Sequence, residues 1–150
     1  MRIPADSLVL VADGEKALFL VNRGDAVHPA LAVVEHEKEE DPPTSEQGTG
    51  KAGRVFKSGA RRSAVAETDW HRLQKERFAA DLVPVLEKHA GRHGGPLILA
   101  APPAILGELR EALPKRLAAR VLAEIPKDLT KHPVPDIERH LAAEDEVYPE

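Results

Sequence analysis

The sequence predicts an α/β domain in which helices pack on a mixed five-stranded sheet. Three observations lead to this fold class. Three short apolar segments, separated by turn residues, open the chain. A long amphipathic stretch follows them, and two further apolar segments then alternate with helical patterns. Strands in direct succession predict antiparallel neighbours, whereas strands joined through helices predict parallel ones.

The first three strands are expected at Ser7–Ala12, Glu15–Asn22 and Ala30–His36, where apolar and β-branched residues gather. Asp13-Gly14 separates the first two segments and is typical of a two-residue type I′ hairpin turn. Arg23-Gly24-Asp25 provides the second turn. The chain therefore opens with three antiparallel strands.

A helix is predicted from Ala64 to about His89. Its apolar residues are expected along one stripe, which consists of Trp70, Leu73, Phe78, Leu82, Val85 and Leu86. Pro84 should kink this helix or start a new turn. Thr68 or Asp69 is expected to cap its N-terminus, and Trp70 to anchor it to the sheet.

The second half continues with a strand at Leu97–Ala101, a helix opened by Pro102-Pro103, a strand at Ala119–Ile125 and a helix at Val134–Ala142. The segment 119–125 also fits a helix. Because the last two strands join through helices, they should lie parallel in the same sheet, with right-handed connections. The order β-β-β-α-β-α-β-α is similar to that of ribonuclease H-type domains.

The composition bounds the class of protein. Of 150 residues, 42% are hydrophobic and 31% charged, as in globular proteins, and the absence of Cys excludes disulfides, thiolate zinc sites and Cys nucleophiles. The first apolar run, Leu8–Ala12, is shorter than the roughly 7–15 residues of a signal peptide core or the about 20 of a membrane span. We expect a single cytoplasmic domain over residues 1–141, no membrane contact, and a disordered acidic tail over 142–150.

Residues 37–63 show no periodicity, and a connection longer than about 12–15 residues is expected to be functional or disordered. We therefore predict a flexible loop. Gly48–Val55 spells G-x-G-x-x-G-x-V, a pattern of kinase and dinucleotide-binding loops. However, no strand precedes it, H-R-D and D-F-G are missing, and a P-loop would need Gly at Ser45 and Ser or Thr at Ala52. The pattern favours a linker over a nucleotide site.

Five basic residues and no acid lie between positions 47 and 63 of this loop: Lys51, Arg54, Lys57, Arg61 and Arg62. Its glycines let the backbone approach a polyanion, and Lys or Arg contacts to phosphate supply most sequence-independent affinity for nucleic acid. These five are the candidate nucleic-acid or anion-binding residues. The alternative is a solvated loop that pairs with the acidic block Glu37–Asp41.

Other polar motifs fit structural roles. His89 and His93 have the i,i+4 spacing of a metal-binding pair, but the glycines around them favour histidines at a helix C-terminus. Asp128 and Thr130 are typical of a turn. The sequence therefore predicts no catalytic residues, no metal site and no cofactor.

Four blocks carry a family resemblance: "VLVADGEKALFL", "DPPTSEQGTGKAGRVFKSGARRSAVAETDWHRLQKERFA", "LAAPPAILGELR" and "KDLTKHPV". Together they resemble the bacterial host attachment proteins from Ile3 to about Leu141. The segment "ADGEKALFL" and the elements after it are also similar to the middle domain of archaeal and eukaryotic peptide-chain release factors. In those factors, the long loop carries Gly-Gly-Gln, which reaches the peptidyl-transferase centre of the ribosome.

This chain departs from that pattern, because the corresponding stretch is "FKSGARRSA" and Gly-Gly-Gln does not occur in it. The resemblance therefore implies the fold and argues against peptidyl-tRNA hydrolysis. We predict a non-enzymatic cytoplasmic protein that contacts RNA or the ribosome through loop 47–63. The alternative is a small-ligand or nucleotide-binding protein, or an enzyme, that uses the same loop. The oligomeric state is not predicted.

Overall fold

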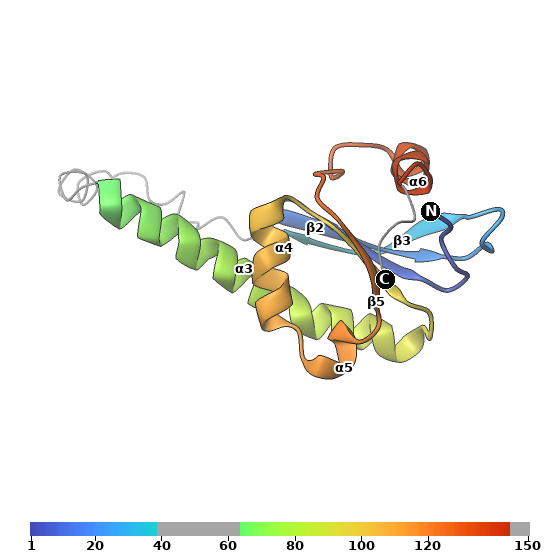
Figure 1. Cartoon of the computed structure of the whole chain (residues 1–150), viewed down its shortest axis with the longest axis horizontal. Coiled ribbons are helices and arrows are strands. Elements are labelled where there is room, and N and C mark those ends of the chain that lie inside the picture. The colour runs from blue at the N-terminus through green and yellow to red at the C-terminus, as the bar shows by residue number, and fades with distance from the viewer. Residues whose placement is uncertain (39–63, 145–150) are drawn as a thin grey trace.

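Five strands form one mixed sheet in the computed structural model, which describes residues 1–38 and 64–144 (Figure 1). β1 pairs antiparallel with β2, and β2 with β3, whereas the pairs β1–β4 and β4–β5 are parallel. The order across the sheet is β3-β2-β1-β4-β5. The predicted mixed sheet is confirmed, with strands β1 (Leu8–Ala12), β2 (Lys16–Asn22), β3 (Leu31–Lys38), β4 (Leu97–Ala100) and β5 (Val121–Ile125).

The hairpin between β1 and β2 is confirmed, but its turn is not the predicted type I′. The Asp13 N–H donates to the Lys16 carbonyl at 3.1 Å, which makes Gly14 and Glu15 the central residues. Gly14 has a φ of 122°, whereas Glu15 lacks the positive φ that a type I′ turn needs at both positions. The Asp13 carboxylate sets the turn instead, because it accepts the N–H groups of Glu15 and Lys16 at 2.7 and 2.9 Å.

The helices of the described part of the chain are α3 (Ala64–Arg92), α4 (Pro103–Ala112), α5 (Lys115–Ala118) and α6 (Val134–Ala142). α6 has the predicted bounds. The one-turn helix α5 was not predicted, since four residues are too few for a periodic pattern. α3 continues through Pro84 as one helix of 29 residues and does not start anew there.

The helices cover both faces of the sheet, which gives three layers (Figure 1). On one face, α3, α4 and α5 pack on alternate residues of β1 such as Leu8 and Leu10. On the other face, Ile137 and Leu141 of α6 join a second cluster with Val9 and Val11. Successive side chains of a strand point to opposite faces, so β1 is buried on both sides at the centre of the sheet.

Only part of α3 takes part in this core, and here two predictions are wrong. Trp70 and Leu73 are 50% and 46% exposed, whereas Phe78 is buried. Leu73 precedes Phe78 by five residues, which turns it about 140° around the helix and out of the buried stripe. Trp70 therefore does not anchor α3 to the sheet. Because α3 begins at Ala64, Thr68 and Asp69 lie within the helix and are not its N-terminal cap.

β3 is longer than predicted at its C-terminal end. Glu37 pairs with Ala17, and Lys38 with Lys16, so these two residues belong to the sheet and not to the loop. Ala142 likewise belongs to α6 and not to the tail. Ala143 caps the C-terminus of α6, and the Glu144 carboxylate lies 2.7 Å from Nζ of Lys127, so this start of the predicted disordered tail is ordered. The rest of the predicted loop and tail, 39–63 and 145–150, lies outside the described residues.

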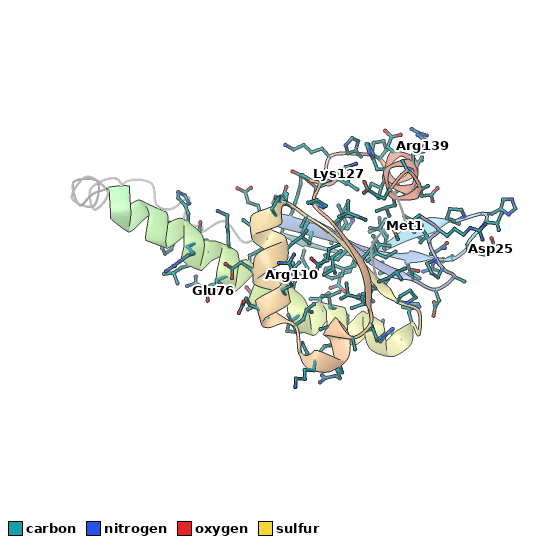
Figure 2. The ribbon with its side chains drawn as sticks, in the orientation of Figure 1. Met1, Asp25, Glu76, Arg110, Lys127 and Arg139 are labelled. Carbon is teal, nitrogen blue, oxygen red and sulfur yellow. The ribbon has the colours of Figure 1, made fainter. Side chains whose placement is uncertain are left out.

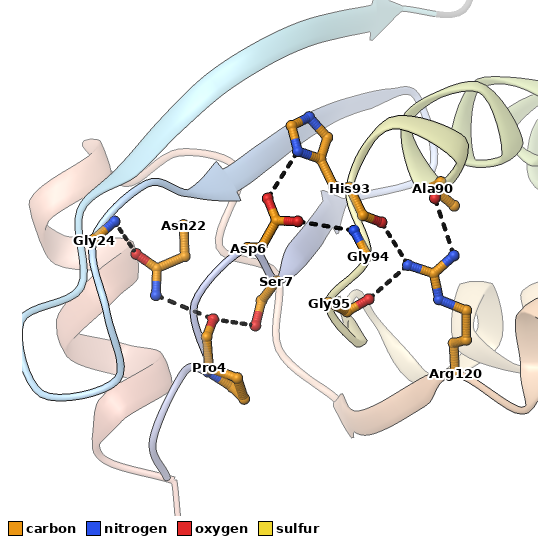
Figure 3. A network of polar contacts seen from close by, with 10 residues as sticks. All are labelled: Pro4, Asp6, Ser7, Asn22, Gly24, Ala90, His93, Gly94, Gly95 and Arg120. Atoms are coloured by element: carbon orange, nitrogen blue, oxygen red, sulfur yellow. Dashed lines mark hydrogen bonds and ion pairs between the residues drawn. The ribbon is translucent and has the colours of Figure 1, made fainter.

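The C-terminus of α3 is fastened to the start of β1 by Asp6 (Figure 3). The Asp6 carboxylate accepts the N–H of Gly94 at 2.8 Å and lies 2.9 Å from Nδ1 of His93. The hydrogen bond with His93 holds the pKa of Asp6 below its ordinary value. Asp6 also has a positive φ of 63°, a conformation that costs free energy in a residue other than Gly. Its contacts with the end of α3 keep it in that conformation.

Arg120, just before β5, donates hydrogen bonds to backbone carbonyl groups at the C-terminal end of α3 and in the turn that follows it (Figure 3). Its guanidinium donates to the carbonyl oxygens of Ala90, His93 and Gly95 at 3.0, 2.6 and 2.6 Å. The last carbonyls of a helix have no partner within it, and a cation there also suits the helix dipole. Arg120 therefore joins α3 to the parallel half of the sheet.

At Gly95, the segment after α3 passes very close to the backbone of Ala5 and Asp6. A Cβ on Gly95 would lie 2.4 Å from the carbonyl oxygen of Asp6, whereas a Cβ on Gly91 or Gly94 would meet nothing within 4 Å. The obstacle at Gly95 is backbone, which cannot move aside as a flexible side chain could. The close approach of the two segments requires glycine here.

We expect Gly95→Ala to lower the free energy of unfolding by more than about 2 kcal/mol, because it forces the Asp6 segment away from α3. Gly91→Ala is the matched control. It lies in α3 with open space around it, so stability should stay equal or rise by up to about 1 kcal/mol. Urea unfolding followed by circular dichroism measures both values. Equal stability of the two variants would contradict the role given to this junction.

Candidate functional site

The predicted binding residues Lys51, Arg54, Lys57, Arg61 and Arg62 lie outside the described residues, as does the glycine pattern 48–53. The structure therefore does not test either of them. It does describe the helix that follows the loop in the sequence. The candidate site is built here from that helix and from the strand that precedes the loop.

The N-terminal half of α3 extends away from the sheet (Figure 1). From Trp70 to Arg77, every described side chain is exposed or half-buried, and Phe78 is the first buried one. Residues 64–77 correspond to a rise of about 21 Å beyond the packed part of the helix. The chain thus enters α3 at the end that is farthest from the core.

Charges of both signs lie on this free end. Arg72, Lys75 and Arg77 carry three positive charges, and the sequence places three negative charges there, on Glu67, Asp69 and Glu76. Figure 2 labels Glu76 on the extended part of α3. None of the three cations forms an ion pair with another described residue. In the core-bound half of the helix, Glu87 pairs with Arg116. The three cations of the free end are therefore available to a polyanion.

A polar cluster ties the packed half of α3 to β3. The Glu35 carboxylate lies 2.8 Å from Nζ of Lys88 and 2.7 Å from Nε2 of His89. The hydrogen bonds from Lys88 and His89 lower the pKa of Glu35 to about 2. Burial, and then the neighbouring Glu35 carboxylate, raise the pKa of Glu37. Glu35 is therefore held as an anion, whereas the charged form of Glu37 is disfavoured relative to an isolated glutamate.

A β-bulge makes this cluster possible. Val33 lies opposite Leu20, which faces α6, whereas Glu35 lies opposite Phe19, which faces α3. In a regular strand, residues two apart share one face. The register shift next to Phe19 and Leu20 therefore turns Glu35 towards α3, as bulges commonly redirect side chains.

His89 and His93 do not converge on a shared site. His89 is buried, stacks on Phe19 with ring centroids 6.0 Å apart, and contacts Glu35, whereas His93 contacts Asp6. The described residues include no group of three or more His, Cys, Asp or Glu side chains placed to hold a metal ion. Both histidines instead fasten the C-terminal end of α3, in agreement with the helix-end interpretation.

Asp128 and Thr130 form the predicted turn. The Asp128 carboxylate accepts the N–H of Thr130 at 3.0 Å and lies 2.6 Å from its hydroxyl, which is also 3.1 Å from the Asp13 carboxylate. Burial opposes ionisation of Asp128, but the hydrogen bonds from Thr130 outweigh it, so the pKa of Asp128 is lowered. These contacts join the loop after β5 to the β1–β2 turn and have a structural role.

The chain matches the family described as bacterial archaeo-eukaryotic release factor family 12 over residues 6–141, from the start of β1 to the last turn of α6. It belongs to this family. The membership confirms the resemblance to release factors that "ADGEKALFL" and the order of elements indicate. Curated proteins, by contrast, give no match to the chain. The resemblance to host attachment proteins stays a prediction.

Two features of this release factor family 12 domain bear on its chemistry. Its sequence has no Gly-Gly-Gln, the tripeptide that the release-factor resemblance associates with hydrolysis. Of the helices within residues 1–38 and 64–144, none is both long enough and apolar enough to cross a membrane. The described site offers an exposed helix end, and the other half of the same helix is held to the sheet by ion pairs and hydrogen bonds.

The sequence does not reveal the residues that hold the packed half of α3 to the sheet, which are Glu35, Asp6 and Arg120. Glu35 falls within the predicted strand Ala30–His36, and a single sequence carries no reliable signal for the bulge that turns it towards α3. Asp6 and Arg120 were not singled out, because their partners on α3 are more than 25 positions away. Gly94-Gly95 indicates the end of the helix, and Gly95 is also the point of close approach to the Asp6 backbone.

Replacing Glu35 by Gln should lower the free energy of unfolding at pH 7 by about 1–2 kcal/mol, since the charge-assisted contacts to Lys88 and His89 are lost. The pKa of Glu35 is lower in the folded state, so its contribution is complete above its ordinary pKa of 4.5 and is lost as the pH falls towards 2. The deficit of the variant should therefore shrink over this interval. Unfolding in urea at a series of pH values measures it.

Glu37→Gln is the matched control on the same strand. Because the raised pKa of Glu37 shows that its charge is disfavoured, removing that charge should leave stability at pH 7 unchanged or slightly higher. A larger loss for Glu37→Gln than for Glu35→Gln would contradict the assignment of the two carboxyl groups.

Proposed function

We propose that this domain is a non-enzymatic factor that contacts RNA, in the ribosome or free, through the basic segment 47–63 and the free end of α3 that follows it. Lys51, Arg54, Lys57, Arg61 and Arg62 are the proposed phosphate contacts within that segment. We further propose that the protein acts in the cytoplasm, where the ribosome is found.

The observation that carries the proposal is the free end of α3, which follows the basic segment 47–63 in the sequence. Arg61 and Arg62 are separated from Ala64, the first residue of α3, by Ser63 alone, and Arg72, Lys75 and Arg77 follow on the described part of the helix. This brings basic residues of the segment and of the helix into one continuous stretch of chain. A helix end that extends about 21 Å beyond the core can enter a groove that the body of the domain cannot.

Membership of a release factor family supports a ribosomal partner, and the missing Gly-Gly-Gln limits the activity. Without the tripeptide, the chain has no counterpart of the residues that act on peptidyl-tRNA in the factors it resembles. Binding without hydrolysis therefore fits the sequence better than release activity does. The same segment remains the place where a small anionic ligand would bind, which is the alternative function.

We also infer a ribonuclease H-type arrangement for the sheet. It is supported by the order β3-β2-β1-β4-β5, in which an antiparallel three-stranded unit continues into two parallel strands joined through helices.

The proposal is tested by co-sedimentation with ribosomes and by binding to a labelled 20-nucleotide single-stranded RNA at several salt concentrations. Changing the five proposed residues, Lys51, Arg54, Lys57, Arg61 and Arg62, to Glu should abolish binding. In the wild type, five phosphate contacts to a single strand predict a slope of log K against log salt of about −3.5, from about −0.7 per contact.

The control variant changes Arg23, Lys115 and Lys131 to Glu, three exposed cations on other parts of the domain. It alters the net charge in the same direction but should keep most of the affinity and the salt slope. The proposal is wrong if the wild type binds neither ribosomes nor RNA at low salt, or if both variants lose affinity equally.

A further inference from the structure

Two histidines meet beside α6, on the face of the sheet opposite α3. His132 lies in the turn before the helix and His140 in its last turn, and their ring centroids are 4.6 Å apart. Both residues are half-buried, and neither imidazole has a hydrogen bond or an ion pair with a described residue. They differ in this from His89 and His93, each of which has a carboxylate partner. The ring nitrogens of the pair are therefore free for a ligand.

The separation of the two rings fits the coordination of one metal ion. Zinc binds a histidine nitrogen at about 2.0–2.1 Å, and its ligands lie at tetrahedral or somewhat smaller angles around it. With these values, an ion bonded to one nitrogen of each ring holds the ring centroids about 4.5–5.2 Å apart. The observed separation of 4.6 Å lies in this interval. The two rings therefore have the spacing of a chelating pair.

Asp136 is the third side chain on this face of α6. It precedes His140 by four residues, and residues at that spacing are neighbours on a helix surface. Helical side chains lean towards the N-terminus, so the ring of His140 leans over the turn that carries Asp136.

The Asp136 carboxylate is bonded to Arg139, which Figure 2 labels on α6. The Arg139 side chain is 72% exposed, and an ion pair this exposed contributes little free energy. No three metal-ligating side chains are in place within the described residues. Rotation of the Asp136 side chain away from Arg139 supplies the third ligand beside the two histidines.

We propose that His132, Asp136 and His140 form a binding site for a zinc ion, with water in the remaining position. Two imidazoles and one carboxylate are a recurring set of zinc ligands. Magnesium and calcium, by contrast, prefer oxygen ligands alone. The site lies on α6 and goes beyond the proposed function, since it does not depend on RNA binding at α3.

A bound zinc ion would join the loop after β5 to the last turn of α6. That loop is already held to the β1–β2 turn through Thr130, and α6 is held to the start of β3, because the Glu138 carboxylate accepts the N–H of Leu31 at 2.7 Å. The ion would add a link between these two attachments. An ion that binds only the folded chain raises its stability.

Calorimetric titration of the full chain with zinc chloride, after EDTA treatment and dialysis, measures binding at this site. We expect one zinc ion per chain. Zinc chloride should also raise the Tm of the protein, whereas magnesium chloride at the same concentration should not.

His132→Ala and His140→Ala should each weaken zinc binding by at least the roughly ten- to hundredfold that loss of an outer-shell partner costs. Neither residue belongs to the buried core, so circular dichroism should show both variants folded. The matched control changes His28 and His71 to Ala together, because these are exposed histidines on other parts of the domain. Its affinity for zinc should equal that of the wild type.

Two further variants test the part played by Asp136. Asp136→Asn removes the charge of the third ligand and should weaken zinc binding while the two histidines remain. Arg139→Ala frees the Asp136 carboxylate, so its zinc affinity should be equal to that of the wild type or up to about fivefold higher, the factor that an exposed ion pair is worth.

The inference is wrong if the wild type binds no zinc, since the two rings would then only be in contact with each other. It is also wrong if the His28 and His71 control loses as much affinity as His132→Ala and His140→Ala, because zinc would then bind to scattered histidines. Wild-type affinity in Asp136→Asn, or weaker binding in Arg139→Ala, would overturn the three-ligand site.

Discussion

The mismatch between the length of α3 and the size of the sheet determines the organisation of this domain. A helix of 29 residues rises about 43 Å, whereas strands of four to eight residues span roughly 13–27 Å. The helix cannot bury its whole length on such a sheet. Its C-terminal half carries the buried stripe from Phe78 to Ala90, and its N-terminal half extends beyond the body. The exposure of Trp70 and the position of Arg72, Lys75 and Arg77, which form no ion pair with any described residue, follow from this mismatch.

The free end of α3 has a fixed direction only if the rest of the helix is held in place. Three kinds of contact hold the packed half. The apolar stripe contributes burial, Arg120 satisfies the last carbonyls, and Glu35 and Asp6 pair with His89 and His93. These contacts come from β3, from the segment before β1 and from the start of β5. The helix is therefore fixed to both antiparallel and parallel parts of the sheet, and its direction is fixed with it.

Much of this architecture could be predicted from the sequence, because it depends on local patterns. The apolar runs gave all five strands, and Val134–Ala142 gave α6 with its correct bounds. The predictions are wrong where contacts between residues far apart in the sequence determine the packing. Trp70 has the residue type of an anchor, but its angle on α3 and its distance from the packed half turn it away from the sheet. Glu35 changes face only because β3 bulges opposite Phe19 and Leu20. The five predicted binding residues lie where the structure gives no description, so the site itself remains a proposal.

Hydrogen–deuterium exchange along α3 tests the central claim, that the helix has a packed half and a free half, most directly. A helix end that packs on nothing is only marginally stable, so amides of residues 70–77 should exchange far faster than those of residues 78–92 in the free protein. Added RNA should then slow exchange in residues 70–77 and leave residues 78–92 unchanged. Equally slow exchange along residues 70–92 in the free protein would contradict the account, because it would mean that the N-terminal half is also packed.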